Sequence, residues 1–181
     1  MKKHLTAFGR IFLLMVILAL PALADGPSTA WIYKSDQYNF SLTLPDSVWV
    51  ERPSTINGVA GFLKKGYAMR ADIFVVTCES DEAFEKIARK VKKDMQSYVP
   101  ASTFEQGKTE SGHHYQLGLG TEFNEHATNG ISLVQSLVWI ESRNIIVRVC
   151  FQGESVDRPT YKGVDTNTLQ VAGRAICLSP N

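Results

Sequence analysis

Three of the four histidines, His113, His114 and His126, lie within fourteen residues and are the side chains best suited to bind a metal ion. Apolar and polar residues alternate over 113–123, which predicts a strand. Because neighbouring strand residues point to opposite faces, His113 and His114 cannot chelate one ion, and the far end of the strand lies about 30 Å from His114. The metal site that the pattern leaves open would use His114 and Glu122, which share a face, with further ligands from another strand.

The three cysteines, Cys78, Cys150 and Cys177, can form one disulfide and leave one thiol. On the chain-entropy model, closing the roughly 70-residue loop between Cys78 and Cys150 gives about 4.4 kcal/mol, and closing the roughly 27-residue loop between Cys150 and Cys177 gives about 3.5 kcal/mol. Loop length therefore does not decide between the two pairs. Cys78 and Cys150 both follow apolar strand patterns, so we expect that pair. Cys150 with Cys177, and three buried free thiols, are the alternatives.

The sequence contains no motif that assembles a catalytic centre or binds a cofactor, such as G-x-S-x-G, H-E-x-x-H, C-x-x-C or a phosphate loop. A thiol enzyme would need a base beside one of the cysteines, and the spacing supplies none. Gly118 and Gly120 lie inside a strand pattern, where we expect them to allow a bulge or close packing under a large neighbour. We therefore predict neither enzymatic activity nor a cofactor.

Four large aromatic residues are the best candidates for an apolar recognition patch, because such side chains contribute binding energy efficiently. They are Trp31, Tyr33, Trp49 and Trp139. The alternative is that they are ordinary core residues on strands. Acidic and basic residues alternate over 81–94 at three- and four-residue spacing, which is typical of a solvent-exposed helix face.

Two periodicities indicate the elements that must position these residues. A two-residue period over 38–44 predicts a strand, which ends before a proline that has no N–H to donate. A three- and four-residue spacing over 81–98 predicts a helix that begins after the N-cap Ser80. Residues 58–78 are expected to form two strands, and the consecutive apolar residues 73–76 indicate cover on both faces.

The rest of the chain continues this alternation of strands and helices. We expect a second helix over 165–175, although Gly173 interrupts its pattern. Further strands are expected at 103–109, 113–123, 131–140 and 144–151. This order predicts an α+β fold, a single-domain α/β/α sandwich in which a mostly antiparallel sheet of about six or seven strands is flanked by two helices.

The first of these strands carries a pattern that resembles a known fold family. Tyr38, Phe40, Leu42, Leu44 and Pro45 form Y-x-F-x-L-x-L-P, and Trp49 follows a few residues later. Together with the element order, this pattern resembles the PsbP-like fold, which includes the extrinsic photosystem subunit and small exported bacterial proteins of the DcrB-like kind. The resemblance implies an α/β/α sandwich that serves as an accessory or binding module, without a shared set of catalytic residues.

Residues 1–24 have the order of a secretory signal peptide. Three basic residues precede an apolar run over 11–20, which is roughly half the length of a membrane span. We expect cleavage near Ala24, which leaves 25–181 as one domain in the periplasm or outside the cell. Asp25 stands where many bacterial PsbP-like lipoproteins carry the acylated cysteine, so we expect no lipid anchor and no membrane span.

Loss of this leader would remove three basic and no acidic residues and change the formal charge from +1 to −2, which does not favour binding to nucleic acid. The sequence best supports an exported, soluble, non-enzymatic accessory or binding module of the bacterial cell envelope, whose partner is a protein or an envelope component. Two alternatives remain open: a small-molecule or metal-ion binding protein, and an exported hydrolase or thiol enzyme.

Overall fold

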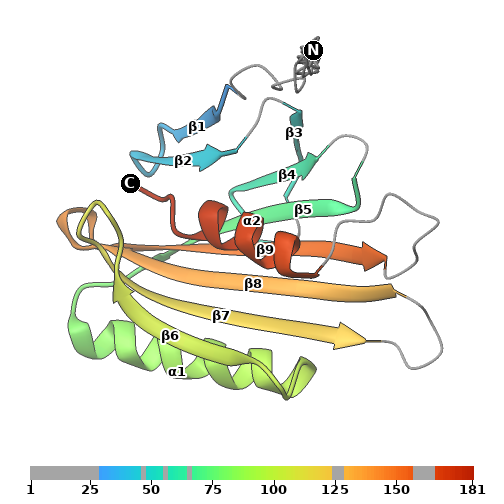
Figure 1. Cartoon of the computed structure of the whole chain (residues 1–181). Coiled ribbons are helices and arrows are strands. Elements are labelled where there is room, and N and C mark those ends of the chain that lie inside the picture. The colour runs from blue at the N-terminus through green and yellow to red at the C-terminus, as the bar shows by residue number, and fades with distance from the viewer. Residues whose placement is uncertain (1–28, 46–47, 55–56, 65–66, 124–128, 157–165) are drawn as a thin grey trace, which may run out of the picture.

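The computed structural model describes residues 29–45, 48–54, 57–64, 67–123, 129–156 and 166–181. Within these residues the chain forms a seven-stranded sheet, a separate two-stranded hairpin and two α-helices (Figure 1). The expected signal peptide, residues 1–24, lies outside the described residues.

Seven strands form one antiparallel sheet in the order β3-β4-β5-β9-β8-β7-β6. Their bounds are β3 Trp49–Arg52, β4 Ala60–Lys64, β5 Met69–Thr77, β6 Thr103–Lys108, β7 His114–Phe123, β8 Asn129–Ile140 and β9 Ile145–Val156. The remaining strands, β1 (Trp31–Ser35) and β2 (Phe40–Leu44), pair with each other in a second, two-stranded sheet. A 3₁₀ turn, Glu141–Arg143, joins β8 to β9.

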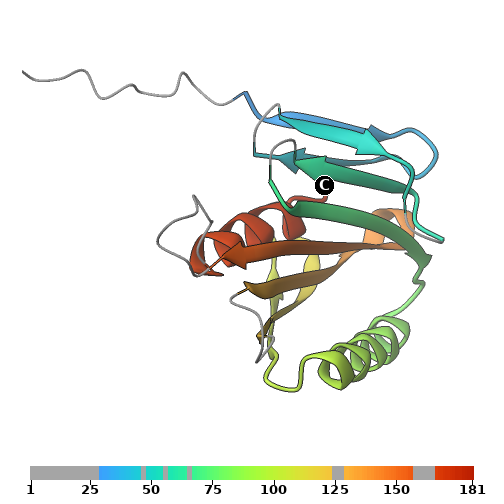
Figure 2. The same ribbon diagram turned by 90° about the vertical axis from the view of Figure 1, so that its right-hand side faces the viewer.

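The two helices cover opposite faces of the large sheet. Helix α1 (Asp81–Tyr98) packs on the face that we call the outer face, and helix α2 (Thr166–Cys177) packs with the β1–β2 hairpin on the inner face (Figure 2). The α/β/α sandwich predicted from the sequence is therefore confirmed. The sequence pattern does not predict β1, β3 or the hairpin as an additional layer above the inner face.

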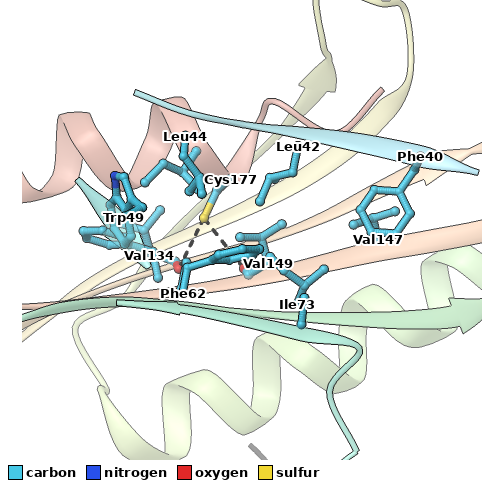
Figure 3. Close-up of a cluster of buried hydrophobic side chains, with 14 of the residues drawn as sticks. Phe40, Leu42, Leu44, Trp49, Phe62, Ile73, Val134, Val147, Val149 and Cys177 are labelled. Carbon is cyan, nitrogen blue, oxygen red and sulfur yellow. Dashed lines mark hydrogen bonds between the residues drawn. The ribbon is translucent and has the colours of Figure 1, made fainter. Parts of the chain in front are cut away.

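The inner core lies between the large sheet, α2 and the hairpin. Leu42 and Leu44 of β2 are fully buried against side chains of the sheet such as Phe62 (Figure 3). Each fully buried leucine stabilises the fold by about 1.5–3 kcal/mol, so the alternating residues of β2 hold the hairpin in place. The Cys177 thiol lies in the same core and donates to the carbonyl oxygens of Val134 at 3.5 Å and Val149 at 3.7 Å.

The chain after α2 also holds the hairpin, through backbone hydrogen bonds. The Ser41 N–H donates to the Asn181 carbonyl oxygen at 2.8 Å, and the Asn181 N–H donates back to the Ser41 carbonyl oxygen at 3.0 Å. The Thr43 N–H donates to the Ser179 hydroxyl at 3.0 Å. Residues 179–181 therefore lie beside β2 and are hydrogen-bonded to its backbone.

Helix α1 has the bounds that its apolar stripe predicts. The Ser80 hydroxyl accepts from the Ala83 N–H at 3.2 Å, which confirms the predicted N-cap. Its apolar side packs on β8 and β9, where the Phe84 ring stacks on Trp139 with centroids 5.8 Å apart. The Gln116 side-chain amide donates to the Ala88 carbonyl oxygen at 3.0 Å, so β7 also contacts the helix through a buried hydrogen bond.

The second half of α1 approaches β7 where that strand has no side chains. A Cβ at Gly118 would lie 2.7 Å from the Met95 sulfur, and a Cβ at Gly120 would lie 2.9 Å from Val99 Cγ1. The predicted close packing at these glycines is confirmed. Gly173 allows the same close packing for α2, because a Cβ there would lie 2.6 Å from the Phe151 ring. Helix α2 continues through Gly173 without a break.

We predict that Gly118→Ala lowers the free energy of unfolding by about 1–3 kcal/mol, the usual cost of overpacking a filled core. The added methyl group would meet both Met95 and Phe104 at 2.7 Å. Gly107→Ala is the matched control, since its methyl group would lie 3.1 Å from the Tyr115 ring, which is only half-buried and can move. Urea unfolding followed by circular dichroism measures both; an equal loss in the two variants would contradict the prediction.

Candidate functional site

One half of the outer face has no helix over it within the described residues. Helix α1 lies beside β6 and β7, at the opposite edge of the sheet from β3 (Figure 1). The cover expected on both faces of residues 73–76 is therefore only partly present: Ile73 is fully buried in the inner core, whereas Val76 is 40% exposed on the outer face. Val50 and Leu63 are likewise exposed, by 53% and 43%.

We call this surface the open face. It consists of the outward-pointing residues of four neighbouring strands: Val50 and Arg52 of β3, Leu63 of β4, Arg70, Asp72, Phe74 and Val76 of β5, and Arg148, Cys150 and Gln152 of β9. The register places them in rows across the sheet, because paired residues point to the same side. Apolar side chains and guanidinium groups therefore alternate over one continuous surface.

Asp72 organises two of these guanidinium groups. Arg52 donates to Asp72 Oδ1 at 3.2 Å, and Arg70 Nε lies 3.8 Å from Asp72 Oδ2. The Arg52 contact spans two strands and passes over Gly61, where a Cβ would lie 3.1 Å from Asp72 Oδ1. Asp72 is 4% exposed, so its ion pair with Arg52 is shielded on one side and orients the Arg52 side chain, whereas Arg70 makes only the longer contact.

Arg148 is arranged differently, because the described residues place no carboxylate within 4.0 Å of it. Its guanidinium donates to Gln135 Oε1 at 3.0 Å and lies over the Phe74 ring, 5.5 Å from the centroid. The Cys150 thiol donates to the same Gln135 oxygen at 3.6 Å. Arg148 Nε and Gln135 Nε2 are buried and have no hydrogen-bond acceptor in the described part of the chain.

Two hollows open on this surface. One of about 340 Å³ lies between Leu63, Tyr67 and Arg70 on one side and Gln152 on the other. The second, of about 150 Å³, lies where the end of α1 meets β8 and β9, and both Gln135 and Arg148 line it. A third hollow of about 890 Å³ lies away from the open face, between α2, the hairpin and the β6–β7 turn.

The structure does not bring His114 and Glu122 together. His114 and Glu122 are eight residues apart on β7, about 26 Å along the strand, so they cannot share an ion. His114 Nε2 instead lies 3.8 Å from Glu141 Oε1. Within the described ranges no three His, Cys, Asp or Glu residues are grouped to hold a metal. His126 lies outside the described residues.

All three cysteines are free thiols, and the expected Cys78–Cys150 disulfide is not formed. The Cys78 N–H bonds to Asn144, six residues and about 20 Å along β9 from Cys150, whereas bridged Cα atoms lie within about 7 Å. Cys150 bonds to Gln135 on the outer face and Cys177 lies in the inner core, so the sheet separates the alternative pair. Burial raises the pKa of each thiol, which disfavours the nucleophilic thiolate.

The aromatic candidates occupy two separate cores. Trp31 and Tyr33 meet the edge of the Phe62 ring at 5.4 and 5.2 Å and attach the hairpin to β4. Trp49 is buried in the same inner core. Trp139 is buried under α1, and its indole N–H donates to the Cys78 carbonyl oxygen at 3.3 Å. These side chains therefore pack layers of the fold together.

Sequence reasoning missed the polar residues of the open face. Arg148 interrupts the apolar segment IIVRVCF, and Asp72 interrupts the neighbouring strand ADIFVV. A charged residue within a buried strand needs a partner, so this interruption is the signal that could have identified them. Their grouping follows from the β5–β9 register, which no single strand reveals.

An ionic network lies beside the hollow of about 890 Å³, on the inner side. Arg174 of α2 lies 2.6 Å from Glu105 of β6, and the Tyr115 hydroxyl donates to the same carboxylate at 3.0 Å. The hydrogen bond from Arg174 is the main reason that the pKa of Glu105 is lowered, and burial of Glu105 partly opposes it. The network connects α2 to the β6–β7 edge, and Glu105 neutralises the charge of Arg174.

Solved structures with the same fold include the Ran-binding protein Mog1p of Saccharomyces cerevisiae, with a TM-score of 0.53 and 5% identity over 85% of this chain and 95% of that one. A point mutant of Mog1 matches with a TM-score of 0.51 and 6% identity over 84% and 95%. LpqN of Mycobacterium tuberculosis, described as involved in cell envelope biogenesis, has a TM-score of 0.50 and 15% identity over 87% and 92%. These likenesses support the PsbP-like fold. No protein-family model and no curated protein sequence matches the chain.

Within the described residues, neither helix combines the length and the apolar character needed to cross a membrane. Helix α1 is long enough at 18 residues, but one side of it carries charged residues throughout.

We predict that iodoacetamide modifies the thiols slowly in the folded protein and that all three react once the protein is unfolded, because burial raises their pKa values. Intact-mass spectrometry of the non-reduced protein counts the added groups. Addition of a single group after unfolding would show that two cysteines had formed a disulfide and would contradict the prediction.

The Glu105–Arg174 pair predicts a pH dependence of stability. Because folding lowers the pKa of Glu105 from its ordinary value of 4.5, the stabilisation is complete above that pH and is lost as the pH falls through the lower folded-state pKa. Glu105→Gln should therefore lower the melting temperature at neutral pH, and the gap to the wild type should close in acid. Glu110→Gln, at an exposed residue, is the control; a gap that persists unchanged in acid would contradict the prediction.

Proposed function

We propose that the chain is an exported, non-enzymatic accessory module of the bacterial cell envelope that binds a partner protein through the open face. The observation that carries this proposal is the uncovered half of the outer face, where Val50, Leu63 and Val76 are exposed beside Arg52 and Arg70. Exposed apolar side chains gathered on one surface are typical of protein-binding sites.

The composition of the open face fits a protein partner. Arginine and tyrosine are enriched at protein interfaces, and the open face offers Arg52, Arg70 and Arg148 with Tyr67 and Tyr98 at its margins. Asp72 holds Arg52 in place before a partner arrives, which lowers the entropy lost on binding. The antiparallel sheet beneath is rigid and keeps the surface in shape.

The placement in the envelope draws on the first residues and on the fold. Residues 1–24 have the order of a signal peptide that would be cleaved near Ala24. LpqN, which has the same fold, is described as involved in cell envelope biogenesis, and Mog1p is described as a Ran-binding protein. We extend from these likenesses to an accessory role, and assign the chain to the exported DcrB-like group.

The state of the cysteines supports binding rather than thiol catalysis. Each thiol donates to a backbone carbonyl or to Gln135, and burial raises its pKa. An effective nucleophile would need a lowered pKa and a base within hydrogen-bonding distance. These thiols therefore serve as packing groups.

We predict that the immobilised protein captures a partner from envelope extract and that Val50→Glu reduces this capture at least tenfold, because a buried charge at an apolar contact costs more than 1.4 kcal/mol. Val171→Glu is the matched control, since Val171 is 61% exposed on α2, on the other side of the sheet. Circular dichroism confirms that both variants fold. Capture that survives Val50→Glu and is lost in Val171→Glu would place docking elsewhere and refute the proposal.

A further inference from the structure

The smaller hollow of the open face combines a cation with an apolar wall. It measures about 150 Å³ and lies between the end of α1 and strands β8 and β9. Met95, Tyr98 and Leu133 form its apolar side, and Gln135 and Arg148 form its polar side, with the exposed Asp94 at the end of α1 on the rim. A hollow of about this volume with apolar walls accepts a group as large as benzene, so a branched aliphatic side chain fits.

Arg148 is half-buried and carries a charge that the described residues do not neutralise by direct contact. A guanidinium has five N–H donors in a fixed fork, and Arg148 meets only neutral groups, the Gln135 oxygen at 3.0 Å and the Cys150 thiol, within the described residues. By comparison, Arg52, Arg70 and Arg174 each lie within 4.0 Å of a carboxylate. A half-buried charge without a counterion is costly to hold, which indicates that a group from outside completes the site.

The hydrogen-bond donors beside this hollow indicate which chemical group from outside would complete the site. Arg148 Nε and Gln135 Nε2 both lack an acceptor within the described part of the chain, and both are donors only. A carboxylate offers two acceptor oxygens in a plane that matches the guanidinium fork. The apolar wall formed by Met95, Tyr98 and Leu133 requires that the carboxylate carry a short apolar group.

We propose that this hollow binds the carboxyl-terminal residue of the partner polypeptide, with its carboxylate on Arg148 and Gln135 and its apolar side chain against Met95, Tyr98 and Leu133. This inference rests on the proposed function, since it names the part of the partner that the open face recognises. Exposed Tyr98 stands at the rim of the hollow, where its ring can cover the bound side chain.

The test is a titration of the ¹⁵N-labelled protein by NMR with two probes that differ in one group. The first is the peptide Gly-Ser-Gly-Ser-Leu with a free carboxyl end, and the second is the same peptide with an amidated end. We expect the free acid to shift the backbone signals of residues 133–135 and 148–150, and the amide to bind at least tenfold more weakly. Equal binding of the two peptides, or no binding of the free acid, would overturn the inference.

Variants of the two arginines separate a specific contact from general charge. Arg148→Gln should weaken binding of the free acid at least tenfold, because it removes the charge-assisted hydrogen bonds to the carboxylate. Arg89→Gln removes an exposed arginine of α1 and should leave the affinity unchanged. If Arg148→Gln does not fold, Arg148→Lys keeps the charge but loses the fork, and should still weaken binding. Unchanged affinity in the folded Arg148 variant would overturn the inference.

A third probe, 4-methylpentanoate, carries the same apolar group and carboxylate without a peptide. Weaker binding of this acid than of the peptide supports a polypeptide as the source of the carboxylate. Equal or tighter binding of the acid overturns the inference in favour of a free small acid.

The results also distinguish an error in the carboxylate site from an error in the proposed function. Loss of capture in Val50→Glu, together with no effect of Arg148→Gln on the peptide, would leave docking on the open face intact and remove the carboxylate site.

Discussion

At Gly118 and Gly120, helix α1 lies so close to β7 that no side chain fits between them. This close approach sets the position of the helix on the sheet. Its first turns pack on Trp139, and its last turns lie over the two glycines. A helix anchored at that edge is too narrow, at about 10 Å, to cover strands that lie several times 4.8 Å away. The open face is therefore a direct result of where α1 can pack closely.

The two faces of the sheet consequently differ in chemistry. The inner face is closed by α2 and the hairpin, and the residues of its core are mostly apolar and buried. The outer face is closed at one edge only, and polar residues such as Asp72 and Arg148 occupy positions that a second helix would otherwise fill with apolar contacts. Strands β5 and β9 belong to both environments, because alternate residues along each strand point to opposite faces.

Local sequence patterns predict which helices and strands form better than they predict which elements pack against one another. The stripe over 81–98 predicts α1 because a helix contacts the sheet through one side, and the alternation over 38–44 predicts β2. Alternation shows that a strand has a buried side, but not which sheet contains it, so the separate hairpin was not predicted. Gly173 was expected to interrupt α2, since its role as a contact point depends on Phe151 of another strand. The cluster around Arg148 likewise depends on register, which brings together residues that are remote in sequence.

The pairing of β2 with residues 179–181 has a consequence for the order of folding. Ser41 and Asn181 are 140 residues apart in sequence, and α2, which completes the same core, lies almost as far from the hairpin. Contacts of such high sequence separation form slowly and late. A nascent chain that has not yet released residues 166–181 has no α2 to close its inner core. The inner core can therefore close only once this segment is free to pack.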